Sequence, residues 1–261
     1  MLKLGGSVIT VKEERYTPNQ AAISRLVGEI KQAEVKPLIL IHGGGSYGHP
    51  IAKDHQIKGG YREPSQLQGF AKTHQAMVTL NGMVLEALLQ EDIPSMSLPP
   101  SAFLTTDRGR IRFLELRPIL KLLELGVLPV LYGDAVLDST LGFTILSGDQ
   151  LAAHLAIKLN AGRIIMGIDV DGIYSRNPKT DPSAQLIPHL TLHELREVLK
   201  HLQEETVEEA DVTGSMAGKI QELIPALKRG AQALIVNAEK PGNIYKALKR
   251  EQVLGTTLQA V

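Results

Sequence analysis

Residues 40–50 of the 261-residue chain read LIHGGGSYGHP, and the fold is best approached from this stretch. The apolar run 37–41 leads into it like a buried strand, and four glycines and two histidines then fall within nine residues. Glycine has no Cβ, so backbone N–H groups in such a loop can approach a ligand closely. A strand that ends in a glycine loop favours an anion, above all a phosphate, although glycine turns also close strands for structural reasons alone.

Three further glycine turns are spread along the chain. They read KLGGS at 3–7, SGD at 147–149 and GSMAGK at 214–219, and the last two each precede a helical pattern. The free N–H groups and the dipole of a helix N-terminus both attract negative charge. Four such turns in one chain indicate a ligand that carries several phosphates.

Bulk composition narrows the class of protein. Lysine plus arginine equals aspartate plus glutamate at 28 each, which argues against broad nucleic-acid or acidic-membrane binding. There is no cysteine, so disulfides, zinc–thiolate sites and thiol nucleophiles are excluded. No signal peptide or membrane-spanning run is visible. We therefore expect a cytoplasmic protein with neither a nucleic acid nor a membrane as partner.

The hydrophobic pattern predicts alternating strands and helices. Strands are expected at 1–4, 37–41, 93–98, 127–132, 163–167 and 233–236, with 8–10 continuing the first strand. Helices are expected from 18 to about 30 and at 65–91, 117–125, 147–159 and 243–249, and hairpins at 104–113 and 136–146. This alternation predicts an α/β fold: one domain over residues 1–261, built as an αβα sandwich on a mainly parallel sheet with β-hairpin excursions.

Charged residues at the glycine turns are the first candidates for phosphate chemistry. Lys3 lies in a predicted buried strand, where a lone ammonium is costly without a partner or ligand. Lys219 lies at a helix start, where a cation is disfavoured unless an anion is bound. Asp149 is read either as a helix N-terminal charge or as a carboxylate that positions the two lysines, and Lys12 is a weaker candidate.

The remaining candidates for binding phosphate or nucleotide are histidines and the pair Asp169 and Asp171. His49, between Gly48 and Pro50, is expected to donate a hydrogen bond to a phosphate oxygen, and His42 to support the loop. The other histidines are interpreted as satisfied or exposed; they are His55, His74, His154, His189, His193 and His201. Asp169 and Asp171 fit either Mg²⁺ or nucleotide hydroxyls, or an ordinary turn. No His-Glu-x-x-His spacing occurs, so no protein-held metal is predicted.

Two common nucleotide motifs are missing. The phosphate loop Gly-x-x-x-x-Gly-Lys-Ser/Thr is absent, and no Gly-x-Gly-x-x-Gly follows the first strand. Their absence weighs against a P-loop kinase and against a nicotinamide dehydrogenase.

Taken together, the motifs resemble the amino acid kinase superfamily over nearly the whole chain and in the expected order. The segments on which this resemblance rests are KLGGSVIT at 3–10, YGD at 132–134, SGD at 147–149, DVDGIY at 169–174 and GSMAGK at 214–219. Within the superfamily, HGGGSYGHP at 42–50 and PPSAF at 99–103 resemble the isopentenyl phosphate kinases. The resemblance implies a homodimer that uses ATP and Mg²⁺ to phosphorylate an alkyl monophosphate, with an acceptor lobe over about 1–160 and a nucleotide lobe over about 161–261.

The resemblance also implies roles for single residues. The catalytic set would be Lys3, Lys12, His49, Asp149 and Lys219. The acceptor phosphate would be held by Gly44, His49 and Gly148. The nucleotide would be held by Lys3, Gly5, Gly6, Ser7, Gly45, Asp169, Tyr174, Gly214 and Lys219.

The isoprenoid tail of such an acceptor needs an apolar pocket. Met77, Leu80 and Met83 on the predicted helix 65–91, or Ile145, could line it, although a helical apolar stripe is more often plain core. Two alternatives stay open: a sister kinase for a phosphonate, carbamate or acylated amino acid, and a non-catalytic nucleotide-binding regulatory domain. His49 and the absence of a visible arginine-lined carboxylate site favour the phosphate acceptor over a sister kinase. The presence of Lys3, Lys12, Asp149 and Lys219 together argues against a non-catalytic domain.

Overall fold

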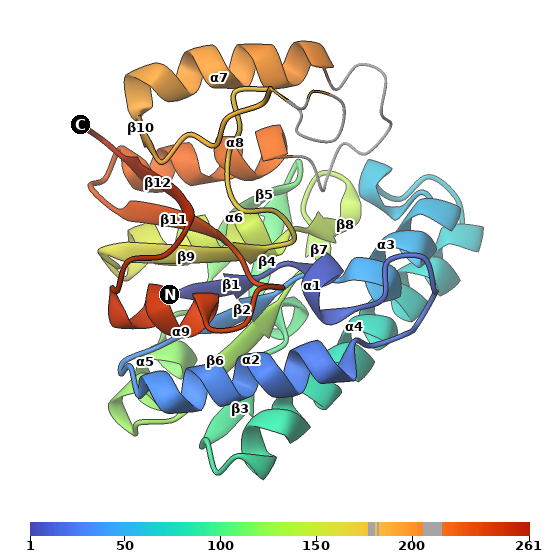
Figure 1. Cartoon of the computed structure of the whole chain (residues 1–261). Coiled ribbons are helices and arrows are strands. Elements are labelled where there is room, and N and C mark those ends of the chain that lie inside the picture. The colour runs from blue at the N-terminus through green and yellow to red at the C-terminus, as the bar shows by residue number, and fades with distance from the viewer. Residues whose placement is uncertain (177–180, 182, 206–215) are drawn as a thin grey trace.

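The computed structural model describes residues 1–176, 181, 183–205 and 216–261. Its main feature is an eight-stranded sheet in the order β10-β12-β11-β9-β1-β2-β6-β3 (Figure 1). The strands are β1 (Leu2–Leu4), β2 (Leu40–His42), β3 (Ser95–Ser97), β6 (Leu128–Tyr132), β9 (Arg163–Ile168), β10 (His189–Thr191), β11 (Gln232–Asn237) and β12 (Gly255–Gln259). All neighbours in this order run parallel except β11 and β12. The predicted mainly parallel sheet is confirmed.

Helices cover both faces of this sheet, as an αβα sandwich requires (Figure 1). One apolar core lies under α1 (Gly6–Ile9), α2 (Gln20–Ala33), α4 (Ser65–Gln90) and α9 (Asn243–Lys249). The other lies under α5 (Arg117–Glu124), α6 (Gly148–Lys158), α7 (Leu192–Glu205) and α8 (Met216–Leu227). Helix α3 (Gly45–Asp54) packs on α4, and short 3-10 turns occur at η1 (Ile57–Gly59) and η2 (Pro100–Ala102).

A smaller four-stranded sheet carries the two predicted hairpins. Its order is β5 (Arg110–Leu114), β4 (Leu104–Asp107), β7 (Asp134–Asp138) and β8 (Gly142–Leu146). Buried Asp138 joins the hairpins, because its carboxylate accepts hydrogen bonds from the Thr106 hydroxyl and from the backbone of Gly109 and Leu141. Both hairpin predictions are confirmed.

Two segments differ from the sequence prediction. Residues 8–10 do not extend the first strand, since Gly6–Ile9 turn into the one-turn helix α1 with Thr10 N–H donating to the Gly6 carbonyl. The predicted loop at 42–50 also shortens, because α3 begins at Gly45. Pro50 cannot donate to the Ser46 carbonyl within that helix, and the Tyr16 N–H donates to it instead at 3.3 Å.

The parallel strands place the glycine turns at one edge of the sheet. Strands β1, β2, β6 and β9 run in the same direction, so the segments after Leu4, His42, Tyr132 and Ile168 all emerge from the same edge. We call this the carboxyl edge. No helix in the described part of the chain is long and apolar enough to cross a membrane.

Candidate phosphate-binding site

Three charged side chains meet at the carboxyl edge. Lys3 on β1 places its Nζ 2.6 Å from Oδ1 of Asp149, and Lys219 on α8 places its Nζ 3.4 Å from Oδ2 of the same carboxylate. The contact between Lys3 Nζ and Asp149 Oδ1 is an ion pair, but its angles are not those of a hydrogen bond. Asp149 lies in the first turn of α6, which Ser147 caps by accepting the Gln150 N–H. Three distant parts of the sequence thus meet at one carboxylate.

The charges of this cluster do not balance. Two lysines share one aspartate, and the Lys3 and Asp149 side chains are only 4% and 7% exposed. Burial lowers the pKa of Lys3, and Lys219 lowers it further, against the opposing effect of Asp149. Burial would raise the pKa of Asp149, but Lys3 and Lys219 lower it to about 2. The three paired side chains alone sum to one positive charge, and Asp169 is a further acidic group whose charge acts on Lys3. Two lysines held this close together favour a bound anion beside them.

Three of the four glycine turns pack backbone against backbone beside this cluster. A Cβ on Gly6 would lie 2.1 Å from the Gly45 nitrogen, and one on Gly43 would lie 2.7 Å from the Gly6 nitrogen. Gly45 has a φ of +48°, which side chains rarely adopt. A Cβ on Gly148 would lie 3.5 Å from Cε of Lys3 and 3.1 Å from the His42 carbonyl oxygen. The turns therefore meet one another through main chain rather than side chains, and the turn at Gly148 lies against the side chain of Lys3.

The two histidines of residues 42–50 have different surroundings. His42 is fully buried at the end of β2, with its ring nitrogens 3.0 Å from the Gly43 carbonyl and 3.2 Å from Oδ1 of Asn81. Burial lowers the pKa of His42. His49 is exposed on α3, one helical turn after Gly45. The structure thus gives His42 a supporting position and presents His49 at the surface.

The remaining candidates lie at the same edge or outside the cluster. Asp169 follows β9, and its charge raises the pKa of Lys3. Asp171 is paired with Lys240 at 2.6 Å and accepts a hydrogen bond from Tyr174. Lys12 is exposed and makes no ion pair with the described residues. Gly5 caps α1, and Ser7 lies within it. Gly214 lies outside the described residues.

The residues suggested for the tail pocket fall into two groups. Leu80 is fully buried in the core, whereas the sulfur of Met77 lies against Gly44 and Gly48, where a Cβ would be 2.9 Å and 2.8 Å away. The Tyr47 hydroxyl lies 3.6 Å from the Met83 sulfur, and Ile145 is half-buried on β8. Met77 therefore lies nearest the glycine turns. Among the described residues, no group of three or more His, Asp or Glu side chains is placed to hold a metal ion.

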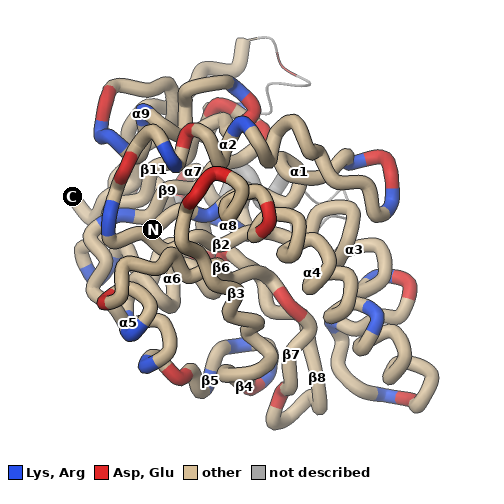
Figure 2. The backbone as a smooth tube through the Cα atoms, turned by 90° about the horizontal axis from the view of Figure 1, so that it is seen from below, with Lys and Arg blue, Asp and Glu red and all other residues tan. Residues whose placement is uncertain are grey.

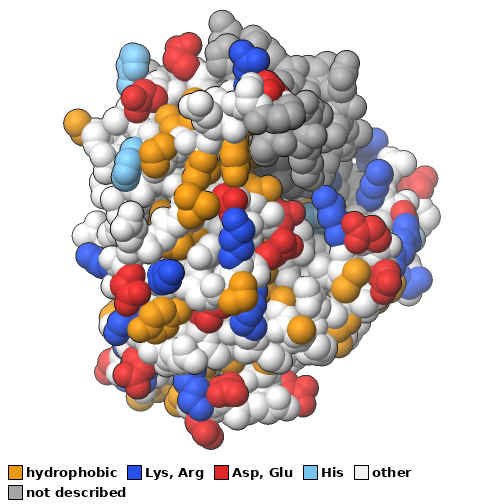
Figure 3. All heavy atoms as spheres, viewed as in Figure 1, with side chains coloured by type: hydrophobic (Ala, Val, Ile, Leu, Met, Phe, Trp, Pro, Cys, Tyr) orange, Lys and Arg blue, Asp and Glu red, His pale blue; other side chains and the backbone are white. Residues whose placement is uncertain are grey.

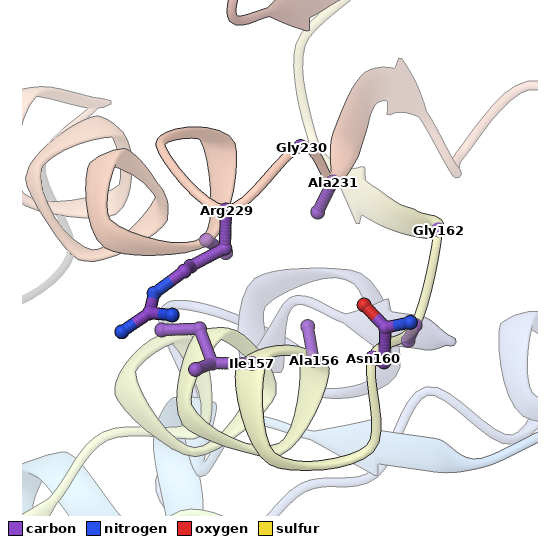
Figure 4. A pocket seen from close by; sticks show the side chains of 9 residues that line it. Ala156, Ile157, Asn160, Gly162, Arg229, Gly230 and Ala231 are labelled. Carbon is purple, nitrogen blue, oxygen red and sulfur yellow. The ribbon is translucent and has the colours of Figure 1, made fainter.

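A cavity of about 40 Å³ elsewhere in the molecule does not belong to this site. Its lining residues Asn160, Gly162, Arg229 and Gly230 precede β9 and β11, so the cavity lies at the opposite edge of the sheet (Figure 4). Positive and negative positions are scattered over the backbone in Figure 2, and both signs are mixed on the face seen in Figure 3. The cluster around Asp149 is thus a local feature and not part of a broad basic face.

One polar pair near the site was not predicted from the sequence. His74 on α4 contacts the buried Asp134 at the start of β7, with 2.9 Å between Nδ1 and Oδ1. Their separation by 60 residues leaves no local signal, and the sequence interpretation treated His74 as an ordinary satisfied or exposed histidine.

Comparison with known proteins adds an independent finding. Residues 1–237 match the amino acid kinase family. The chain is 42% identical to the isopentenyl phosphate kinase of Methanothermobacter thermautotrophicus, over 99% of this chain and 98% of that one. It is 33% identical to the Methanocaldococcus jannaschii enzyme of the same name, over 99% and 97%. A solved structure of an isopentenyl phosphate kinase superposes with a TM-score of 0.85, at 40% identity and 98% coverage of both chains.

Proposed function

The chain belongs to the amino acid kinase family, and from this premise we propose that it is an isopentenyl phosphate kinase, which transfers a phosphoryl group from ATP to isopentenyl phosphate. One observation carries the chemistry. Lys3 and Lys219 both pair with buried Asp149, beside glycine turns that meet one another through main chain. Such a cluster fits adjoining phosphates, whose mutual repulsion is the main obstacle to the reaction.

The residues would act by position and charge. The acceptor is already a phosphate oxyanion, so no side chain has to remove a proton, and direct in-line transfer requires no covalent enzyme intermediate. Lys3 and Lys219 would stabilise charge on the moving phosphoryl group, and Asp149 would keep the two lysines together. The main chain of Gly5, Gly6 and Gly45, with Ser7, would contact the transferring group.

The acceptor and nucleotide would lie on opposite sides of the cluster. The acceptor lobe, over about residues 1–160, contains α3, α4 and the small sheet, and its Gly44, His49 and Gly148 would hold the acceptor phosphate. The nucleotide lobe, over about 161–261, would bind through Asp169, Tyr174, Gly214 and Lys219. Lys12 would reach the transferring group from the segment between α1 and α2.

The proposal has three further parts, each with its own support. Mg²⁺ would accompany the nucleotide phosphates, as kinase chemistry generally requires. The chain would form a homodimer, for which exposed Met96 on edge strand β3 and exposed Leu89 on α4 offer apolar surface. It would work in the cytoplasm, which agrees with its lack of cysteine.

A substrate panel tests the proposal. The full chain is incubated with ATP, Mg²⁺ and one acceptor at a time: isopentenyl phosphate, a short alkyl monophosphate, a phosphonate, glutamate or carbamate. Release of ADP that depends on the acceptor is scored, together with the phosphorylated product. We expect the highest kcat/KM with isopentenyl phosphate. A preference for a carboxylate acceptor would replace the proposal with a sister kinase, and failure with every acceptor would favour a regulatory nucleotide-binding domain.

His49 gives a sharper test of the acceptor side. His49→Ala removes one donor to the acceptor phosphate and should lower kcat about a hundred- to a thousandfold. Because His49 is exposed, the melting temperature should stay within about 2 °C, as a surface change does. Lys53→Ala, also exposed on α3, is the matched control. Near-normal turnover of His49→Ala would remove His49 from the site.

A further inference from the structure

His74 and Asp134 form a fixed pair between α4 and the small sheet. Nδ1 of His74 lies 2.9 Å and 3.2 Å from the two oxygens of Asp134, and Oγ of Ser101 lies 3.4 Å from the same nitrogen. Asp134 is fully buried and also accepts the backbone N–H groups of Ala135 and Ser101. The imidazole is thus held at one ring nitrogen by a carboxylate that is itself held by the main chain.

The pair adjoins the proposed acceptor site from two directions. His74 lies about one helical turn before Met77, whose sulfur contacts Gly44 and Gly48. Asp134 directly follows Gly133, whose N–H donates to the His42 carbonyl and whose Cβ position lies 3.1 Å from the Gly148 nitrogen. The imidazole therefore lies beside the space where the tail of an acceptor bound at Gly44 and Gly148 would start.

The pair leaves one ring nitrogen available. Asp134 accepts, so Nδ1 of His74 carries a hydrogen, and among the described residues Nε2 has no hydrogen-bond partner. The side chain of His74 is 35% exposed, so Nε2 can meet a ligand. The hydrogen bond to Asp134 raises the pKa of His74.

The charge of the pair decides what it can recognise. When His74 is protonated, Asp134 balances its charge, and when His74 is neutral the pair is an anion. Either state attracts a phosphate less than the lysine cluster does, whereas a fixed Nε2 hydrogen-bonds well to a neutral hydroxyl. A purely apolar wall would offer no such partner.

We propose that His74, held by Asp134, is a specificity-determining residue that lets the acceptor site take alkyl monophosphates with a hydroxyl group on the chain. This inference rests on the proposed function, because it assumes that the acceptor phosphate binds at Gly44 and Gly148. It extends the substrate class from unsaturated hydrocarbon tails to hydroxylated tails of the same length.

A matched pair of acceptors tests the inference. Isopentenyl phosphate is compared with five-carbon alkyl monophosphates that carry a hydroxyl at C3 or C4, by kcat/KM and by calorimetric affinity. His74→Leu should lower both values for at least one hydroxylated acceptor about tenfold, through the lost hydrogen bond, and leave those for isopentenyl phosphate unchanged or higher. His74→Gln, which keeps a polar end, should restore part of the difference.

Controls separate specificity from structure. Gln75→Leu changes the neighbouring, exposed residue of α4 and should alter neither acceptor. An equal loss with both acceptors in His74→Leu, accompanied by a lower melting temperature, would make the pair a structural tether and overturn the inference. An unchanged ratio between the acceptors would overturn it too. If wild-type protein fails to phosphorylate isopentenyl phosphate but its affinity for a hydroxylated acceptor still depends on His74, the proposed function fails and the inference stands.

Discussion

Two buried carboxylates in this molecule are held in opposite ways. Glu29 on α2 accepts hydrogen bonds from Arg25 at 2.6 Å and from the N–H groups of Ile244 and Tyr245, in the first turn of α9. Asp149 instead lies between two lysines, of which only one is fully buried. The charge of Glu29 is therefore balanced by Arg25, and its oxygens accept hydrogen bonds from groups of the protein itself. Asp149 instead pairs with two lysines.

The difference is the one expected between a structural ion pair and the phosphate site that we propose at Asp149. The N-cap of α9, Gly242, has no side chain to accept an N–H, and Glu29 supplies the missing acceptor from another helix. We call this contact of Glu29 with Arg25 and the first turn of α9 the structural clip. Nothing in the clip requires a ligand. At Asp149 the second lysine, the glycine turns and the position at the carboxyl edge all fit the anion that we propose to bind there. Burial alone does not distinguish the two, but charge balance does.

The largest effect should follow from removing the central carboxylate. Asp149→Asn removes the carboxylate that pairs with both Lys3 and Lys219, so the lysines should move apart and kcat should fall about a thousandfold. The melting temperature should fall as well, because Lys3 stays buried. Steady-state kinetics and thermal unfolding measure both quantities. Turnover close to wild type would place Asp149 with Glu29 as a structural group.

Removing one lysine should separate activity from stability. Lys219→Met leaves a balanced pair of Lys3 and Asp149, so the substrate-free protein should melt at the same or a higher temperature. The kcat value should still fall about a hundredfold through the lost phosphate contact. Lys228→Met, at an exposed position just after α8, is the control. A clear drop in melting temperature would show that the cluster has no charge excess to relieve.

The reverse pattern is expected at the structural clip. Glu29→Gln should lower the free energy of unfolding by about 1–3 kcal/mol, since a charged acceptor of three donors is lost. The kcat value should not change, because Glu29 and the three residues that donate to it are not among the candidates for the phosphate site. Chemical denaturation and kinetics on the folded variant check this. Lower turnover in fully folded protein would contradict the comparison.

Acid pH gives the smallest effect. The pKa of Asp149 is about 2 in the folded chain, below its ordinary value, so its contribution to stability is complete above that ordinary value and is lost as the pH falls toward 2. Between pH 5 and pH 3 this loss is about 1 kcal/mol. Urea unfolding at each pH should show a shallower acid dependence in Asp149→Asn. Identical slopes would mean that the lysines do not stabilise the carboxylate.

The fold was predictable wherever local and tertiary signals agree. The helix predicted at 147–159, the hairpin at 104–113 and the long helix at 65–91 each have a chemical reason in their own segment, and each is found. The prediction that residues 8–10 continue the first strand was wrong. Val8 and Ile9 favour a strand locally, but packing of Gly6 on Gly45 bends the chain into a helix. Strand β10 has three residues, too few for a periodic signal.

For the candidate site, the sequence predicted the charged residues and one reading of Asp149, its contact with both lysines, but not the polar pairs around them. Lys3 and Lys219 are conspicuous because a cation is costly in a strand core or at a helix start, so the sequence alone marks them. The clip at Glu29 and the pair at His74 depend on partners 215 and 60 residues away, which no local pattern reveals. Arg25 and Glu29, four apart on a helix, look like an ordinary surface pair.

Pro50 has a consequence that reaches beyond its own helix. Because the ring nitrogen of Pro50 carries no hydrogen, the Ser46 carbonyl accepts the Tyr16 N–H instead. This hydrogen bond ties residues 11–17, which include Lys12, to helix α3, which carries His49. The length of residues 11–17 is therefore under a constraint that most surface connections escape. An insertion there would break this hydrogen bond and alter the spacing between Lys12 and His49, the two side chains that in the proposed function contact the same substrate.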